Sequence, residues 1–275
     1  MFRPVAALVL ALLCAHSCLD RVMAQKSAPP LAGALARLEA FPPPQRRVGF
    51  VSPLPIGDTV PYMFYGTFRS RVMLIEQSLQ LRGYDTAAAR AAVGELDHVL
   101  SGIKSRGVEM IVIGGSVLSF AYPRPALLTR LEDASRKLGV PVTTDMEATV
   151  QVMRRAGVHK LAVAHRLNGL DDGALTDYLV AAGFTVEGIV GPQLVVASRA
   201  GTAPDEGSVF AATGEAAGQL YPAADGILFL GGSTTNYPYL AAIQRATRKP
   251  VFNNTMGFLD YVETWLTANP VKRAP

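Results

Sequence analysis

The sequence contains only two cysteines, Cys14 and Cys18, and both lie close to its beginning. They fall within residues 1–24, where a positively charged start precedes an apolar run over residues 5–14 and a small-residue cleavage pattern ends at Ala24. This arrangement is typical of a secretory signal peptide, and the apolar run is too short to span a membrane. We therefore expect a mature chain without cysteine, which excludes a disulfide, a thiolate nucleophile and a cysteine metal ligand.

Other chemical signatures are scarce or missing. Three histidines follow the first 24 residues (His98, His159 and His165), and their spacing does not suit a zinc site. The sequence has neither a Gly-Lys-Ser/Thr phosphate loop nor a three-glycine dinucleotide motif, so no nucleotide cofactor is expected. The formal net charge is only +4 and basic residues are not clustered, which argues against a nucleic-acid partner. No later segment is long and apolar enough to cross a bilayer.

These features predict an exported protein, periplasmic or secreted, that leaves the membrane after signal cleavage. Residues 25–45 are rich in alanine and proline, and we interpret them as a linker. The remaining length can form one large core or two α/β lobes. We expect a first lobe over residues 46–142, completed by residues 250–271, and a second lobe over residues 143–249.

Short apolar runs and helical patterns alternate along these lobes, which predicts an α/β fold with parallel sheets. The predicted strands are residues 47–51, 109–113, 140–143, 160–164, 185–190, 227–230 and 250–252. The predicted helices are residues 70–81, 87–104, 125–138, 145–156, 174–182, 207–220, 239–247 and 257–267.

Two of the apolar runs, residues 111–113 and 227–230, each end abruptly in Gly-Gly-Ser. Their residues are uncharged and β-branched, aromatic or aliphatic, which is typical of strands buried on both faces. Ligands of open parallel sheets bind outside the carboxyl ends of the strands. The matched pair of ends therefore predicts two half-sites that face one cleft.

Bare backbone N–H groups and hydroxyls at such strand ends suit a carboxylate or an enolate. The alternative is that the glycines simply permit tight turns, but a matched pair of motifs favours binding. The candidate residues are Gly114, Gly115, Ser116 and Ser119 after the first strand and Gly231, Gly232, Ser233, Thr234 and Thr235 after the second.

A histidine follows the strand predicted over residues 160–164. At the carboxyl end of a strand, His165 could serve as an acid or base, and the neighbouring Arg166 could pair with a substrate carboxylate. The alternative is a loop histidine whose hydrogen bonds are satisfied by the protein. We expect His98 and His159 to lie on the surface.

The loop over residues 52–65 is long and contains proline, glycine and aromatic residues. Long loops in compact domains are often functional, so we interpret it as a wall or lid of the cleft. Its polar residues Asp58 and Thr59 are candidates for substrate contact.

Other acidic residues have a structural explanation. Asp145 and Glu147 follow Thr144 in a capping-box pattern, which makes them residues of a helix start. Asp171 and Asp172 are expected at the exposed beginning of another helix.

Several islands of the sequence resemble the aspartate/glutamate racemase superfamily, and within it the arylmalonate decarboxylase and maleate isomerase branch. The residues that carry this resemblance are 48–53 (VGFVSP), 111–120 (IVIGGSVLSF), 141–144 (PVTT), 157–164 (GVHKLAVA) and 225–232 (DGILFLGG), with Pro250, Val251, Gly257 and Phe258 extending it. The resemblance implies two pseudo-symmetric Rossmann-like lobes with the site between them. It also implies cofactor-free chemistry at the carbon next to a carboxylate.

The resemblance breaks at the residues that carry the family's chemistry. Racemases and isomerases of the family have one cysteine on each side of the substrate, and these positions match Gly114 and Gly231. The branch also has a tyrosine at the position of His165. The parts that match are Ser116, the amide of Gly115 and the second glycine turn, with Pro53 at the end of the first strand.

Two interpretations remain open. In the first, the protein is a cofactor-independent enzyme on a small carboxylate, with His165 or a hydroxyl replacing the cysteine in proton transfer. In the second, it is an exported binding protein that kept the carboxylate pocket and lost catalysis. A homo-oligomer is compatible with both.

Overall fold

The structure, a computed structural model, describes residues 44–55, 59–83, 85–167, 169–191, 206–231 and 237–271, all within the unit Pro44–Pro275. The strands are β1 (Arg46–Ser52), β2 (Val72–Ser78), β3 (Met110–Ile113), β4 (Val142–Thr144), β5 (Lys160–His165), β6 (Thr185–Val190), β7 (Gly226–Leu230) and β8 (Val251–Asn253). The α-helices are α3 (Thr59–Phe68), α4 (Thr86–Lys104), α5 (Ser116–Ser119), α6 (Arg124–Leu138), α7 (Asp145–Arg155), α8 (Asp172–Ala181), α10 (Glu206–Leu220), α11 (Tyr237–Thr247) and α12 (Asn254–Ala268), with a short 3-10 turn η1 (Arg69–Arg71) before β2.

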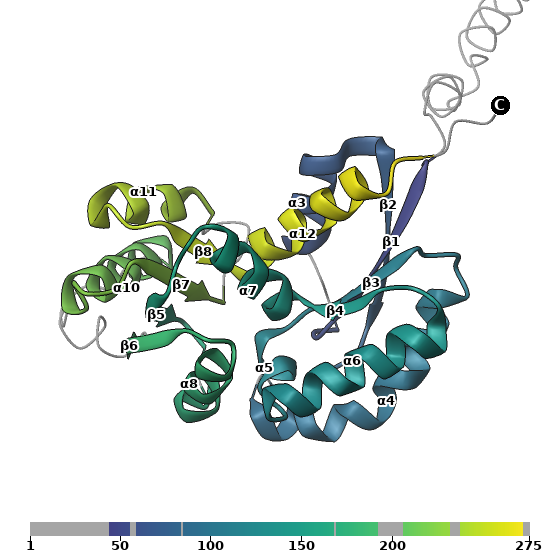
Figure 1. Cartoon of the computed structure of the whole chain (residues 1–275), viewed down its shortest axis with the longest axis horizontal. Coiled ribbons are helices and arrows are strands. Elements are labelled where there is room, and N and C mark those ends of the chain that lie inside the picture. The colour runs from purple at the N-terminus through teal and green to yellow at the C-terminus, as the bar shows by residue number, and fades with distance from the viewer. Residues whose placement is uncertain are drawn as a thin grey trace, which may run out of the picture. The chain divides into compact units, whose positions relative to one another are not determined.

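The strands form two four-stranded parallel sheets with the same topology. Their orders are β2-β1-β3-β4 and β6-β5-β7-β8, so the second half of the chain repeats the strand order of the first (Figure 1). The α/β fold predicted from the sequence is therefore confirmed. Because all strands of a sheet run in parallel, the loops after β1, β3 and β4 meet at one edge of the first sheet, and those after β5, β7 and β8 meet at one edge of the second.

Strands β3 and β7 are buried on both faces, as their uncharged sequences predicted. In β3, Met110 and Val112 pack with residues of α3 and α12, whereas Ile111 and Ile113 face the other side. Figure 1 shows α3 and α12 on one side of the first sheet and α4 and α6 on the other. In β7 the same alternation places Phe229 against α10 and α11. This period of two follows from the pleat of a β-strand.

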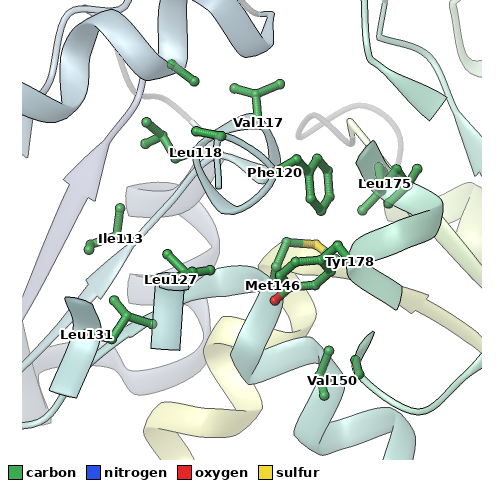
Figure 2. Close-up of a cluster of buried hydrophobic side chains, with 14 of the residues drawn as sticks. Ile113, Val117, Leu118, Phe120, Leu127, Leu131, Met146, Val150, Leu175 and Tyr178 are labelled. Carbon is green, nitrogen blue, oxygen red and sulfur yellow. The ribbon is translucent and has the colours of Figure 1, made fainter. Parts of the chain in front are cut away.

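One hydrophobic cluster extends from the first sheet to the second. It includes Ile113 of β3, Leu118 of α5 and Leu228 of β7. Within it Phe120 and Tyr178 lie edge to face, with ring centroids 5.2 Å apart (Figure 2). The two halves thus share apolar core, which favours one cooperative unit.

The last strand, β8, and the last helix, α12, contact different sheets. Strand β8 pairs with β7 in the second sheet, while α12 contributes Phe258 to the core of the first. Helix α12 also packs along α7, so closely that a Cβ atom at Gly257 would lie 2.7 Å from Cα of Thr149. The chain therefore returns to the first sheet with α12, at Asn254. The lobe boundaries at residues 142 and 249 stay a prediction.

Two predicted elements are wrong. Residues 72–78 form strand β2, not part of a helix over residues 70–81, because β1 pairs with them from Val72 to Ser78. The predicted loop over residues 52–65 contains the start of α3, whose Pro61 falls in the first turn, where a proline is tolerated. The other predicted elements are found with shifts of a few residues at their ends.

Candidate functional site

The turn after β3 is tightly constrained by its surroundings. Gly114 donates its N–H to the carbonyl oxygen of Val51 over 2.9 Å, and a Cβ atom at Gly114 would lie only 2.2 Å from the Phe50 ring. Gly115 has a φ of 95°, a conformation that favours glycine. Its N–H donates to Oδ2 of Asp145 over 2.9 Å. The Gly115 amide, predicted to bind a substrate oxyanion, therefore already holds a side-chain carboxyl.

Two buried hydroxyls follow this turn on α5. Ser116 is 1% exposed and Ser119 is 0% exposed, and neither hydroxyl has a hydrogen-bond partner among the described residues. Buried polar groups are nearly always paired, so an open hydroxyl needs an explanation. One explanation is a ligand that supplies the missing partner.

The carboxyl of Asp145, at the start of α7, is buried, although the sequence predicted only a helix-start role for this residue. Thr144 caps the helix by accepting the N–H of Glu147 over 3.1 Å, as the capping pattern predicted. Asp145 instead points inward, where Oδ2 accepts from Gly115 and, over 2.7 Å, from the side-chain amide of Asn254. Burial raises the pKa of Asp145 to about 6, although these hydrogen bonds act in the opposite direction.

Asn254 starts α12 just as Asp145 starts α7, so the pair joins equivalent positions of the two halves. Asn253 caps α12 by accepting the N–H of Thr255 and donates to the carbonyl oxygen of Phe229 over 2.8 Å. The identical strand orders place both helix starts at the carboxyl ends of β4 and β8. A repeated strand-to-helix position that carries Asp145 and Asn254 was the signal in the sequence that could have revealed this contact.

Tyr237, the first residue of α11, lies within reach of the same carboxyl. Burial raises the pKa of Tyr237 to about 12, and the negative charge of Asp145 contributes to this increase while a hydrogen bond to Thr255 opposes it. The residues gathered around Asp145 thus come from the ends of β3, β4 and β8 and from α11.

The second group of predicted residues lies at the ends of β5 and β7. His165 pairs in register with Leu230, and a Cβ atom at Gly231 would lie 2.8 Å from Cγ of Arg166. Gly231 has a φ of 84°, so this turn also favours glycine. Partial burial lowers the pKa of the Arg166 guanidinium. The structure therefore brings His165, Arg166 and Gly231 together.

His165 is 6% exposed and both of its ring nitrogens face protein groups. Nδ1 accepts the N–H of Leu167 over 3.3 Å, which leaves the ring proton on Nε2 in the neutral tautomer. Nε2 lies 3.0 Å from Oδ1 of Asp172, but the two are not aligned for a hydrogen bond. Nε2 therefore has no hydrogen-bond partner among the described residues.

The remaining residues that the sequence analysis singled out lie in other parts of the chain. Pro53 follows β1 and accepts the N–H of Leu81 over 2.9 Å, so it lies beside the end of the first sheet. His98 and His159 are exposed, and Asp171 caps α8, as predicted. Thr59 starts α3. The predicted contacts Asp58, Gly232, Ser233, Thr234 and Thr235 lie outside the described residues.

Within the described ranges, no cluster of histidine, cysteine or carboxylate side chains is arranged to hold a metal ion. No helix in that part of the chain has both the length and the apolar character needed to cross a bilayer.

The close contact between Gly114 and Phe50 gives a prediction. Gly114→Ala is expected to lower the free energy of unfolding by about 1–3 kcal/mol, because the new methyl group must displace a ring packed 5.1 Å from that of Phe258. Gly94→Ala is the matched control: its Cβ would meet nothing within 4 Å, and it should stabilise α4 by up to about 1 kcal/mol. Urea unfolding measures both, and equal stability of the two variants would show that Phe50 does not fill the space.

Comparisons with known proteins identify the family of this chain. The family model for arylmalonate decarboxylase matches residues 48–270. Among curated proteins, none matches the sequence.

Solved structures share the fold. The unliganded arylmalonate decarboxylase is 19% identical, with a TM-score of 0.64 over 79% of this chain and 91% of that one. A maleate isomerase variant from Pseudomonas putida S16 with maleate is 14% identical, with a TM-score of 0.59 over 81% of this chain and 91% of that one. A Nocardia farcinica maleate cis-trans isomerase mutant with a covalently bound succinylcysteine intermediate is 15% identical, with a TM-score of 0.64 over 81% and 93%. The chain therefore belongs to the arylmalonate decarboxylase family.

Proposed function

We propose that this chain is an exported, cofactor-independent enzyme that acts at the carbon next to the carboxylate of a small mono- or dicarboxylic acid. Its reaction would be an isomerisation, racemisation or decarboxylation that does not use cysteine. The observation that carries the proposal is the pair of buried hydroxyls of Ser116 and Ser119 directly after β3, which have no hydrogen-bond partner in the part of the chain that the structure describes. A bound carboxylate would supply their missing hydrogen bonds.

The absence of a thiol is part of the proposal. The resemblance matches the family's two cysteines to Gly114 and Gly231, and the sequence has no cysteine after Cys18. A side chain at Gly114 would overlap Phe50, and one at Gly231 would need a left-handed backbone. Both surroundings disfavour a thiol, which supports a different proton-transfer group.

His165 is a candidate for that group. It ends β5 beside Leu230, the residue before Gly231, and its Nε2 has no hydrogen-bond partner among the described residues. To reach a substrate, Nε2 would have to turn away from Asp172 or pass its proton through a water molecule. Arg166, which lies against Gly231, is the candidate cation for a substrate carboxylate.

The second candidate function is carboxylate binding without catalysis. The signal-peptide pattern of residues 1–24 favours it, because an exported two-lobed protein suits solute capture. The relatives with maleate or a succinylcysteine adduct support a small carboxylate as the ligand in either case.

The experiment is a thermal-shift screen of the mature protein against malonates, maleate, aspartate, glutamate and aromatic carboxylates, with each hit followed by NMR in deuterated water. Exchange of the α-proton or loss of carbon dioxide would establish an enzyme. A ligand that stabilises the protein but stays unchanged would favour the binding protein. If no compound of the panel stabilises the protein, the proposal that its ligand is a small carboxylate is contradicted.

His165→Gln tests the histidine. If His165 transfers the proton, the variant should keep the thermal shift of the ligand and lose about 10²–10⁴-fold in turnover. His159→Gln is the matched control, because His159 is exposed and should tolerate the change without effect on rate. Turnover at the wild-type rate in His165→Gln would remove His165 from the mechanism.

A further inference from the structure

The buried carboxyl of Asp145 is not needed for the role that its sequence position suggests. The cap of α7 is Thr144, whose hydroxyl accepts the N–H of Glu147. Asp145 is only 3% exposed, and its Oδ2 accepts the N–H of Gly115 just after β3. A helix-start aspartate that served the helix dipole alone would gain nothing from losing its water.

The two oxygens of this carboxyl have different surroundings. Oδ2 accepts two hydrogen bonds, from the Gly115 amide over 2.9 Å and from Asn254 over 2.7 Å. Oδ1 is buried and has no hydrogen-bond partner among the described residues. The hydroxyls of Ser116 and Ser119, on the helix that begins next to Gly115, are open in the same way. Within the described ranges, Oδ2 is thus held by two donors and Oδ1 has none.

Other titratable groups lie close to this carboxyl on two further helices. Its negative charge contributes to the raised pKa of Tyr237 on α11 and of Tyr178 on α8. None of the groups that act on the Asp145 pKa is a cation: the Asn254 side chain and the backbone amides lower it, and burial raises it. Asp145 is therefore a carboxyl stabilised by neutral donors alone, and it can exist with or without its proton.

We propose that Asp145 is a catalytic residue that transfers the proton at the substrate carbon through Oδ1, while Gly115 and Asn254 hold Oδ2. The inference rests on the proposed function and identifies a proton-transfer group other than His165. A carboxyl that is ready to give or take a proton near neutral pH suits this role, and burial raises the pKa of Asp145 to about 6.

The proton balance is simple for each reaction. In a decarboxylation, the bond between the substrate carbon and the departing carboxylate breaks, its electron pair stays behind as an enediolate, and carbon dioxide leaves. The protonated Oδ1 of Asp145 then gives its proton to the carbon, and a solvent proton restores the carboxyl. In α-proton exchange, ionised Asp145 takes the proton, the electron pair again stays on the substrate as an enediolate, and Asp145 returns a solvent proton.

The Gly115 amide and Asn254 have a defined part in this cycle. Both donate to Oδ2, so they stabilise the carboxylate form that proton donation leaves behind. The open hydroxyls of Ser116 and Ser119 remain free to bind the substrate carboxylate or the enediolate.

Asp145→Asn tests the proposal in the full mature protein, with the ligand found by the thermal-shift screen. The asparagine keeps the size of the side chain and an oxygen that can accept from Gly115 and Asn254, but it cannot transfer a proton. The expected result is an unchanged thermal shift with a turnover or α-proton exchange rate at least about 100-fold lower. Asp85→Asn is the matched control, because Asp85 caps α4 and asparagine caps helices equally well.

The remaining outcomes separate the proposal from the function on which it rests. An active wild type with an equally active Asp145→Asn variant would overturn the role of Asp145 and leave the proposed function intact. A variant that loses both the thermal shift and turnover would assign Asp145 to binding and overturn proton transfer. A wild type that binds carboxylates but never changes them would overturn both.

Discussion

Glu147→Gln is expected to lower the free energy of unfolding by about 3–5 kcal/mol. The Glu147 carboxylate accepts from Nε and Nη2 of Arg124 over 2.7 Å each and from the hydroxyl of Tyr178 over 2.6 Å. The side chains of Arg124 and Glu147 are 11% and 7% exposed. Removing one charge of such a largely buried pair leaves the other without its counterion in surroundings that hold little water.

The position of the Arg124–Glu147 pair explains why its loss should destabilise the whole protein. Arg124 starts α6, Glu147 lies in the first turn of α7, and Tyr178 belongs to α8, so three helices meet in one hydrogen-bonded group. The Arg124 guanidinium also donates to the carbonyl oxygen of Ala181 over 3.1 Å. Helix α6 connects β3 and β4 of the first sheet, whereas α8 connects β5 and β6 of the second. Loss of the carboxylate should therefore loosen the junction between the halves.

Two variants check this reasoning in chemical unfolding. Asp97→Asn removes a partner of the exposed pair Lys137–Asp97 and should change stability by less than about 1 kcal/mol. Arg124→Met combined with Glu147→Leu removes both buried charges and should recover a large part of the loss, although the Tyr178 hydroxyl then lacks its acceptor. If the double variant is less stable than Glu147→Gln, side-chain volume and not the unpaired charge controls this site.

The sequence predicted the fold well wherever burial alone decides the structure. The uncharged runs before the two Gly-Gly-Ser turns are buried strands, β3 and β7, because strands covered on both faces need apolar residues throughout. Strand β2 was predicted as a helix for the opposite reason. It lies at the edge of its sheet and only two of its seven residues, Val72 and Leu74, are buried, so its sequence also fits a helical period. Pairing with β1 decides the structure there.

The site was only partly predictable. The turn at Gly114 and Gly115 was predicted because glycines after a buried strand have a visible signature, and the binding role of these residues and Ser116 stays a prediction. Asp145 was interpreted as a helix-start residue because its sequence neighbours provide a complete capping pattern. Its contact with Asn254 spans 109 residues, and local sequence cannot indicate it. Only the repeated topology brings the two helix starts together.

The stability of the wild type is expected to fall relative to Asp145→Asn by about 2–3 kcal/mol between pH 4 and pH 8. Burial raises the pKa of Asp145 from its ordinary 3.8 to about 6, so the folded protein holds this proton more tightly than the unfolded chain does. The stability contributed by the protonated group is fully present below pH 3.8 and is lost as the pH rises through about 6. Asparagine does not titrate, so the stability of Asp145→Asn does not include this fall with rising pH.

Chemical unfolding of both proteins at several pH values measures the effect, because every other titrating group contributes equally to the two curves. Asp97→Asn, at an exposed side chain, should give a curve parallel to that of the wild type. Parallel curves for Asp145→Asn would instead mean that the Asp145 carboxyl is solvated in solution. The expected divergence means that ionisation of Asp145 at neutral pH lowers the stability of the folded protein. A structural role does not account for such a residue, whereas a group that must exchange a proton with a substrate does.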